Sequence, residues 1–248
     1  MDFEPSARAA ALLQRLESFQ ARYLLPGNAA WHAAAAGGEV PDWMEDLRAL
    51  AREEGLWNLC LPALPDGAPG TPLSHVDYAP LAEAMGRLPW AAEVFNCQAP
   101  DSGNMDTLLR HGTPAQKQRW LAPLLAGEMR SAFAMSEPDV ASSDPTNLQA
   151  QVRREGGMLV LNGRKWFITG AAHPRCRLLL VVARNADAAH DDPHGAHSIV
   201  LVPMDTPGVQ VLRNIPVLQH VAVEGHCEIL LRDVRVPAEN LLGGWGQG

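Results

Sequence analysis

The sequence has few positive charges, few cysteines and no long hydrophobic run, and these shortages exclude several classes of protein. Lysines and arginines number 20 against 28 aspartates and glutamates, and the resulting net charge of −8 argues against nucleic-acid binding, which needs a basic surface. No segment reaches the ~18 uninterrupted apolar residues of a membrane helix. The N-terminus carries early acids and lacks the apolar run of a signal peptide. We therefore expect a soluble, cytoplasmic protein with no membrane span and no nucleic-acid partner.

The four cysteines lie far apart, and no two of them form a C-x-x-C pair. This spacing is typical of structural thiols in a reducing compartment. Cys227 stands beside His226 in the stretch GHCE, which would also suit cysteine–histidine chemistry. Because Cys227 falls on an alternating, strand-like segment, a buried structural thiol is at least as good an interpretation.

One histidine-rich stretch, HDDPHGAH, contains residue types that can bind a metal, namely His190, Asp191, His194 and His197. Its proline and glycine, together with the lack of a helical i, i+4 pair, favour a solvated loop between strands. We therefore predict no metal site.

Hydrophobic residues make up 47% and charged residues 19% of the 248 residues, a composition and length typical of two folded domains. Up to about residue 127 the apolar spacing is helical, most clearly over residues 41–55, 75–87 and 113–128. Thr113 is expected to cap the third of these helices, with Pro114 in its first turn and Gln116 three residues after the cap.

After residue 130 the pattern changes to short, β-branched or alternating segments separated by glycine, proline and asparagine turns. Strands are predicted over residues 131–135, 148–155, 158–164, 177–184, 197–204, 208–213 and 226–236. Seven or eight strands at that spacing favour a β-barrel or sandwich. We predict an α+β multidomain protein, with an all-helical domain over residues 1–130 followed by a β domain over residues 131–248.

A hydroxyl-rich stretch, AMSEPDVASSDPTNLQ, follows the first predicted strand and spans residues 134–149. Such a stretch is often only a turn, because Ser, Asp and Pro satisfy or pre-set loop backbone. It can also be a cradle in which N–H groups and hydroxyls face a polar ligand. About twenty residues after its start comes a second stretch, GGMLVLNGRKWFITGA.

Together these two stretches resemble the acyl-CoA dehydrogenase family. The middle β domain of that family carries a hydroxyl–Glu–Pro…Ser–Asp signature and then a strand of the N-G-x-K-x-W-I-T type. The resemblance extends over essentially the whole chain, because residues 96–128 are similar to the family's approach to this domain and residues 234–248 to its exit. EPDVASSD together with NCQAPDSGNM resembles the branch found with aminoglycoside-phosphotransferase-like kinase domains.

The resemblance implies a flavin site that holds FAD. It places the backbone around Phe133, Met135 and Ser136 against the isoalloxazine ring. Phe167 takes the position of the family's common tryptophan against the ring, where an aromatic contact adds ~0.5–1.5 kcal/mol. Ile168 follows it, and Thr169 falls where a hydroxyl bonds the N5 edge of the flavin.

The resemblance also implies a serine beside the phosphate-bearing parts of the ligands. Ser143 falls at this position and is the residue expected to contact substrate. The sequence, however, has one more residue than the usual E-P-x-x-G-S-D, and Ser142 stands where the glycine would be. Both serines therefore remain candidates for the phosphate-side hydroxyl.

The activity implied is the FAD-dependent α,β-dehydrogenation of an acyl-CoA thioester in fatty acid metabolism. Electron-transfer flavoprotein is the implied acceptor, and homo-oligomers are typical of the family. In the family the catalytic base comes from a C-terminal helical bundle that follows a stretch like LLGGWGQG. We expect this bundle to be absent from the chain, which would then be a truncated and inactive form. No catalytic residue is assigned, because Glu137 belongs to the signature turn and has a structural role in the family.

Two alternatives to the dehydrogenase remain open at this point. The chain could be a non-catalytic flavin- or CoA-binding module, or a structural partner of an intact paralogue. A flavin monooxygenase or oxidase on the same fold would need the same middle domain.

Overall fold

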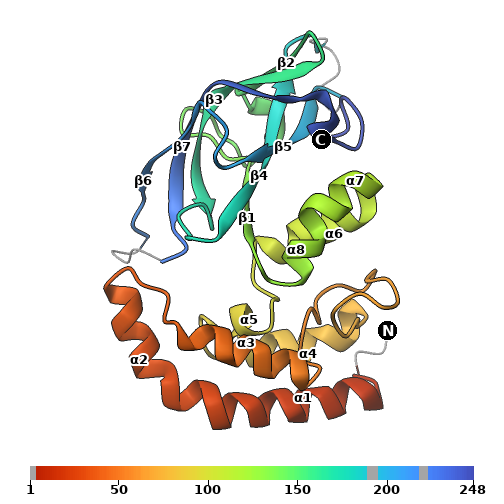
Figure 1. Ribbon diagram of the computed structural model, residues 1–248, viewed down its shortest axis with the longest axis vertical. Helices are drawn as coiled ribbons and strands as arrows, with labels where there is room; N and C mark the ends of the chain where they lie inside the picture. The colour runs from red at the N-terminus through yellow and green to blue at the C-terminus, as the bar shows by residue number, and fades with distance from the viewer. Residues whose placement is uncertain (1–3, 189–194, 218–222) are drawn as a thin grey trace. The chain divides into compact units, whose positions relative to one another are not determined.

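The computed structural model describes residues 4–188, 195–217 and 223–248 (Figure 1). Two compact units are present. The first contains residues up to Asp106 together with 125–127, and the second contains residues 107–124 together with those from Glu128 onward. A helical unit and a mostly β unit therefore follow one another, which confirms the predicted fold class.

The first unit consists of helices, and its core is formed by their apolar faces. Their bounds are α1 (Ala7–Phe19), the π-helical turn η1 (Gln20–Leu24), α2 (Leu25–Ala36), α3 (Trp43–Glu53), α4 (His75–Met85), α5 (Ala91–Val94) and the first part of α6 (Asp101–His111). In α1 the Ser6 hydroxyl accepts a hydrogen bond from the N–H of Ala9, which is a normal N-cap. Its buried residues recur every three or four positions, at Ala9, Leu12, Leu16 and Phe19.

Two of the predicted helices, over residues 41–55 and 75–87, are confirmed as α3 and α4. In α3 the helix begins two residues after Pro41, and the buried side includes Met44 and Ala51. Arg48 lies on the same buried side, where its side chain is fully buried. A fully buried guanidinium requires partners, because isolated buried charge is strongly unfavourable.

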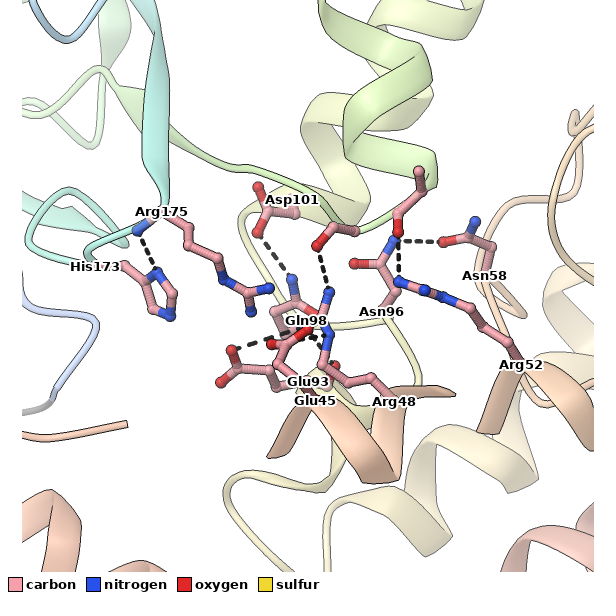
Figure 2. A network of polar contacts seen from close by, with 12 residues as sticks. Glu45, Arg48, Arg52, Asn58, Glu93, Asn96, Gln98, Asp101, His173 and Arg175 are labelled. Carbon is pink, nitrogen blue, oxygen red and sulfur yellow. Dashed lines mark hydrogen bonds and ion pairs between the residues drawn. The ribbon is translucent and has the colours of Figure 1, made fainter. Parts of the chain in front are cut away.

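Those partners hold the short segment 125–127 against α3. The Arg48 guanidinium donates to the Gly127 carbonyl at 2.8 Å, and Arg52 donates to the carbonyl of Ala126 (Figure 2). The Leu125 carbonyl accepts from the Trp57 indole at 2.8 Å and from the side-chain amide of Asn58 at 2.9 Å. These carbonyls stand at the C-terminal end of a helix, where cationic and donor side chains are favourable.

Substituting Gly127 with alanine should therefore destabilise the first unit. Gly127 has φ +67°, and an added Cβ would lie 2.2 Å from an Arg48 nitrogen that burial prevents from moving away. Gly38→Ala is the matched control, because Gly38 has φ +78° and open space around it. We expect chemical denaturation to show a loss of ~1–2 kcal/mol for the control, from backbone strain alone, and a clearly larger loss for Gly127→Ala. Equal losses would show that the contact with Arg48 is unimportant.

The second unit starts with a helical segment that packs with the sheet. It comprises the end of α6, then α7 (Pro114–Gln116), η2 (Lys117–Leu121) and α8 (Ala122–Leu125). The predicted capping box is confirmed, because the Thr113 hydroxyl accepts from the N–H of Gln116 and the Gln116 side chain accepts from the N–H of Thr113. The Gln116 amide also donates to the carbonyls of Glu239 and Leu241 at 2.8 and 2.9 Å. These bonds explain why residues 107–124 group with the sheet.

The remainder of the second unit is an eight-stranded sheet. Its strands are β1 (Arg130–Ala134), β2 (Gln151–Glu155), β3 (Met158–Thr169), β4 (Cys176–Asn185), β5 (His197–Pro203), β6 (Val209–Asn214), β7 (His226–Pro237) and β8 (Leu241–Leu242). The order is β6-β7-β3-β2-β4-β5-β8, with β1 paired in parallel to β4. Inward side chains of β1 to β5 and β7 form one buried cluster, so the sheet curves around its own core.

The seven segments predicted as strands are confirmed as β1 to β7, and β8 completes a sheet within the expected seven or eight strands. Within the described residues no helix is both long and apolar enough to span a membrane. The described residues also contain no group of three potential metal ligands. His197 is buried on β5, whereas His190, Asp191 and His194 lie outside the described residues.

Candidate functional site

Two cavities in the second unit bring together most of the predicted site residues. The larger cavity, of about 460 Å³, lies between the hydroxyl-rich loop and β3, and it is lined by Met135, Ser136, Val140, Ala141, Ser142, Ser143, Trp166 and Phe167. The smaller cavity, of about 200 Å³, is lined by Phe133, Met135, Pro145, Thr146, Val182, His197, Ile199 and Gly248. Met135 borders both cavities.

Phe167 is directed outward by a bulge in β3. Lys165 pairs with Ile229 on β7 and Ile168 pairs with Cys227, so Trp166 and Phe167 together oppose one residue. Phe167 has φ +51°, which is strained for a bulky side chain and costs ~1–3 kcal/mol. Its ring is 44% exposed and meets the Trp166 ring edge-on at 4.8 Å. The bulge therefore exposes an aromatic ring at the cavity that a regular strand would not place there.

The residue after the bulge points the other way. Ile168 is 1% exposed and belongs to the core cluster of the sheet. A ligand in the cavity could therefore contact Ile168 only through main-chain atoms. The N–H of Trp166 donates to the Ser136 carbonyl at 3.0 Å, which joins the bulge to the start of the loop.

A buried ion pair joins the two ends of the loop. The Lys165 ammonium donates to Glu137 Oε1 and to the Met135 carbonyl, both at 2.8 Å. The Glu137 carboxylate also accepts from the N–H groups of Gln149 and Ala150, at 2.8 and 2.9 Å. Burial lowers the pKa of Lys165, and its contact with Glu137 partly opposes that shift. The Glu137 carboxylate is therefore bonded to three donors of the protein itself, and it braces the loop.

The two candidate serines occupy different environments. The Ser142 side chain is buried, where its Oγ accepts from the Glu137 N–H at 3.1 Å and donates to the Glu137 carbonyl at 3.3 Å. Ser143 is exposed at the cavity. After it, Asp144 caps a short 3₁₀ turn, η3 (Pro145–Asn147), by accepting from the N–H of Thr146. Ser142 therefore closes the loop, and Ser143 is the exposed serine that lines the cavity.

Thr169, at the end of β3, is paired with a histidine. Its hydroxyl lies 2.9 Å from Nδ1 of His226, which stands directly opposite on β7. The neighbouring Cys227 is fully buried, and burial raises the pKa of its thiol to about 11. At neutral pH the Cys227 thiol is protonated, which favours its structural interpretation over cysteine–histidine chemistry.

Sequence reasoning missed three of the contributors to this site, namely Lys165, Trp166 and His226. A signal existed for Lys165, because a lysine on a strand between core positions needs a buried anion, and the signature turn contains Glu137 among its acids. No local signal marks His226 as the partner of Thr169, since the two are far apart in sequence.

The arrangement suits a flat, partly polar ring system. Phe167 offers an exposed aromatic wall, and Met135 and Ser136 of the loop line the same cavity. Ser143 also lines this cavity. Sites for such cofactors are mostly apolar with a few convergent polar groups, and the larger cavity has this character. The residues present therefore fit a flavin.

Comparisons with known proteins show the family of the chain. The profile of the "Acyl-CoA dehydrogenase, N-terminal domain" matches residues 6–128, and that of the "Acyl-CoA dehydrogenase, middle domain" matches residues 132–234. The "Probable acyl-CoA dehydrogenase FadE2" of Mycobacterium tuberculosis is 45% identical over 100% of this chain and 60% of its own length. Mouse "Acyl-CoA dehydrogenase family member 11" is 41% identical over 99% of this chain and 32% of its own length.

A solved structure from Mycobacterium abscessus that carries the acyl-CoA dehydrogenase name is similar throughout. It superposes with a TM-score of 0.92 at 44% identity, and the match covers 99% of this chain and 62% of that chain. The chain thus spans between 32% and 62% of the length of these three relatives.

Proposed function

Because the chain belongs to the acyl-CoA dehydrogenase family, we propose that it forms the N-terminal and middle part of an FAD-dependent enzyme that oxidises an acyl-CoA thioester between its α and β carbons. The observation that carries this proposal is the bulge of β3, which holds Phe167 exposed at a cavity bordered by the loop from Met135 to Ser143. FAD, when bound, would supply the two-electron acceptor for this oxidation.

The residues of the site take distinct roles in this proposal. Main-chain groups of Phe133, Met135 and Ser136 would line one edge of the flavin ring, and Phe167 would pack against the ring. Ile168 would contribute main-chain atoms only, because its side chain is buried in the core.

Two hydroxyls would meet the ligands. Thr169 would face the edge of the flavin ring that changes on reduction. Ser143 would face the phosphate-bearing part of the ligands, because the Ser142 hydroxyl is already bonded to both main-chain groups of Glu137.

The two signature acids of the loop, Glu137 and Asp144, are not suited to remove the substrate's α-proton. The Glu137 oxygens accept from Lys165 and from two main-chain N–H groups inside the protein. Asp144 accepts from both the N–H and the hydroxyl of Thr146. We assign the base to neither of them, and we propose acyl-CoA as substrate and an electron-transfer flavoprotein as acceptor on the family resemblance. Homo-oligomeric assembly and a role in fatty acid metabolism are proposed on the same basis.

Replacing Thr169 by valine tests the flavin site. In the full-length protein that carries these residues, Thr169→Val should weaken FAD binding by ~1–3 kcal/mol, because a hydrogen bond at a desolvated edge is lost. Thr169→Ser, which keeps the hydroxyl, should retain most of the affinity. FAD affinity measured by the change in flavin fluorescence is the readout, and equal affinity in wild type and Thr169→Val would remove Thr169 from the site.

A further inference from the structure

The hydroxyl of Thr169 is held by His226, and both residues are fixed by the sheet. They are directly opposite in the antiparallel β3–β7 pair, and the N–H of Gly170 donates to the Gly225 carbonyl beside them at 3.1 Å. On its other side, the N–H of His226 donates to the Asn214 side chain at 2.8 Å, and the His226 carbonyl accepts from the N–H of Ile215 at 3.0 Å. The 2.9 Å contact between Thr169 Oγ1 and His226 Nδ1 therefore joins two side chains on rigid backbone.

This contact decides which way the single proton of the hydroxyl points. When Nδ1 carries a proton, the imidazole donates to Oγ1, and the Thr169 proton is free to point away from His226 as a donor. When Nδ1 carries none, the hydroxyl donates to Nδ1 and offers only lone pairs to other groups. A neutral imidazole keeps one proton in both cases, and it can pass from Nδ1 to Nε2 through water because His226 is only partly buried.

A flavin needs a hydrogen-bond donor at its redox edge in one oxidation state and an acceptor there in the other. The nitrogen on its redox edge is a lone-pair acceptor in the oxidised form and carries an N–H in the reduced form. A lone threonine can donate its proton to the oxidised form. When it accepts from the N–H of the reduced form, its own proton needs another acceptor. His226 Nδ1 is placed to provide that acceptor.

We propose that His226 is a positioning residue that lets the Thr169 hydroxyl donate to the oxidised flavin and accept from the reduced flavin. The inference rests on the proposed function, because it takes Thr169 to face the flavin edge. With oxidised flavin, His226 donates from Nδ1 to Thr169. With reduced flavin, Thr169 donates to His226 Nδ1, and the imidazole proton resides on Nε2.

The first test compares His226→Val with His226→Asn in the full-length protein loaded with FAD. Valine removes the Nδ1 acceptor. With reduced flavin the Thr169 proton then has no hydrogen-bond acceptor, whereas with oxidised flavin that proton is still donated to the flavin. We expect about a tenfold loss of affinity for reduced relative to oxidised FAD, which lowers the midpoint potential of the two-electron couple by about 30 mV. Asparagine can both donate and accept near the Nδ1 position and should keep the wild-type potential.

A double-mutant cycle separates this role from a structural one. If His226 acts through the Thr169 hydroxyl, His226→Val should cause no further shift of the potential in a Thr169→Val background. An equal shift in both backgrounds would overturn the proposal, as would an unchanged potential in the single His226→Val variant.

Nitrogen NMR of the wild-type protein can identify the tautomer of His226 directly. This measurement needs no variant, so it does not depend on whether a variant folds. The His226 tautomer should carry its proton on Nδ1 with oxidised FAD and on Nε2 with reduced FAD. One tautomer in both redox states would overturn the proposal. A full-length protein that takes up no FAD would instead refute the proposed function, so the two failures are distinguishable.

Discussion

Lys165→Met is expected to destabilise the second unit by ~3–5 kcal/mol, because it leaves the Glu137 carboxylate buried without its counter-ion. Both side chains are almost completely buried and their charged atoms are 2.8 Å apart. The same ammonium holds the Met135 carbonyl, so the loop that borders the larger cavity loses its brace as well. We therefore expect FAD affinity to fall together with stability.

Arg153→Met is the matched control for this prediction. Arg153 also pairs with a glutamate on the β unit, Glu155, at 3.2 Å, but both side chains are nearly half exposed. Exposed pairs of this kind contribute ~0–1 kcal/mol. Chemical denaturation of both variants, followed by tryptophan fluorescence, measures the difference. Similar small losses in the two variants would show that the Lys165–Glu137 pair is not the brace of the loop.

A protein limited to residues 1–248 is expected to turn over any acyl-CoA at no more than about one hundredth of the full-length rate. Removal of the α-proton needs a base within hydrogen-bond reach, and general base catalysis contributes ~10²–10⁴-fold to such rates. Glu137 and Asp144 are both engaged inside the loop, so neither can take this role without dismantling the loop.

The assay for this prediction uses an artificial electron acceptor and saturating FAD, with the full-length protein as the positive control. The assay should compare acyl-CoA substrates with acyl groups of several lengths. Turnover by residues 1–248 at more than about one hundredth of the full-length rate would exceed what the loss of a base permits.

The sequence predicts most of the fold because both halves have regular hydrophobic periods. Period-2 segments identified seven strands, and the 3.6-residue period identified α3 and α4. Strand β3 was predicted to end at residue 164, but it continues to Thr169 through the bulge. The bulge breaks the alternation at Trp166 and Phe167, so a rule based on alternation ends the strand too early.

The sequence does not indicate that residues 107–124 group with the sheet, because an amphipathic helical segment has the same pattern whether it packs on helices or on a sheet. Its partners are the carbonyls of Glu239 and Leu241, which are more than a hundred residues away in sequence. Only the folded chain shows that Gln116 reaches them.

The sequence indicated which residues form the candidate site, but it did not indicate which side chains are hydrogen-bonded to one another. The motif placed Ser136, Phe167 and Thr169 in one region, and the structure brings Ser136 and Phe167 to one cavity. The distinction between Ser142 and Ser143 depends on which hydroxyl turns back to Glu137, and adjacent serines in a loop carry no periodic signal. The pairing of Thr169 with His226 depends on strand register across 57 residues.

The most direct test of the account is the anaerobic addition of an acyl-CoA to the purified full-length protein while its visible flavin absorbance is recorded. We predict that the protein carries FAD and that the flavin absorbance falls after the acyl-CoA is added, as oxidation of the thioester requires. A protein without flavin would contradict the account. So would a flavin that a chemical reductant bleaches but a broad series of acyl-CoA thioesters leaves unchanged.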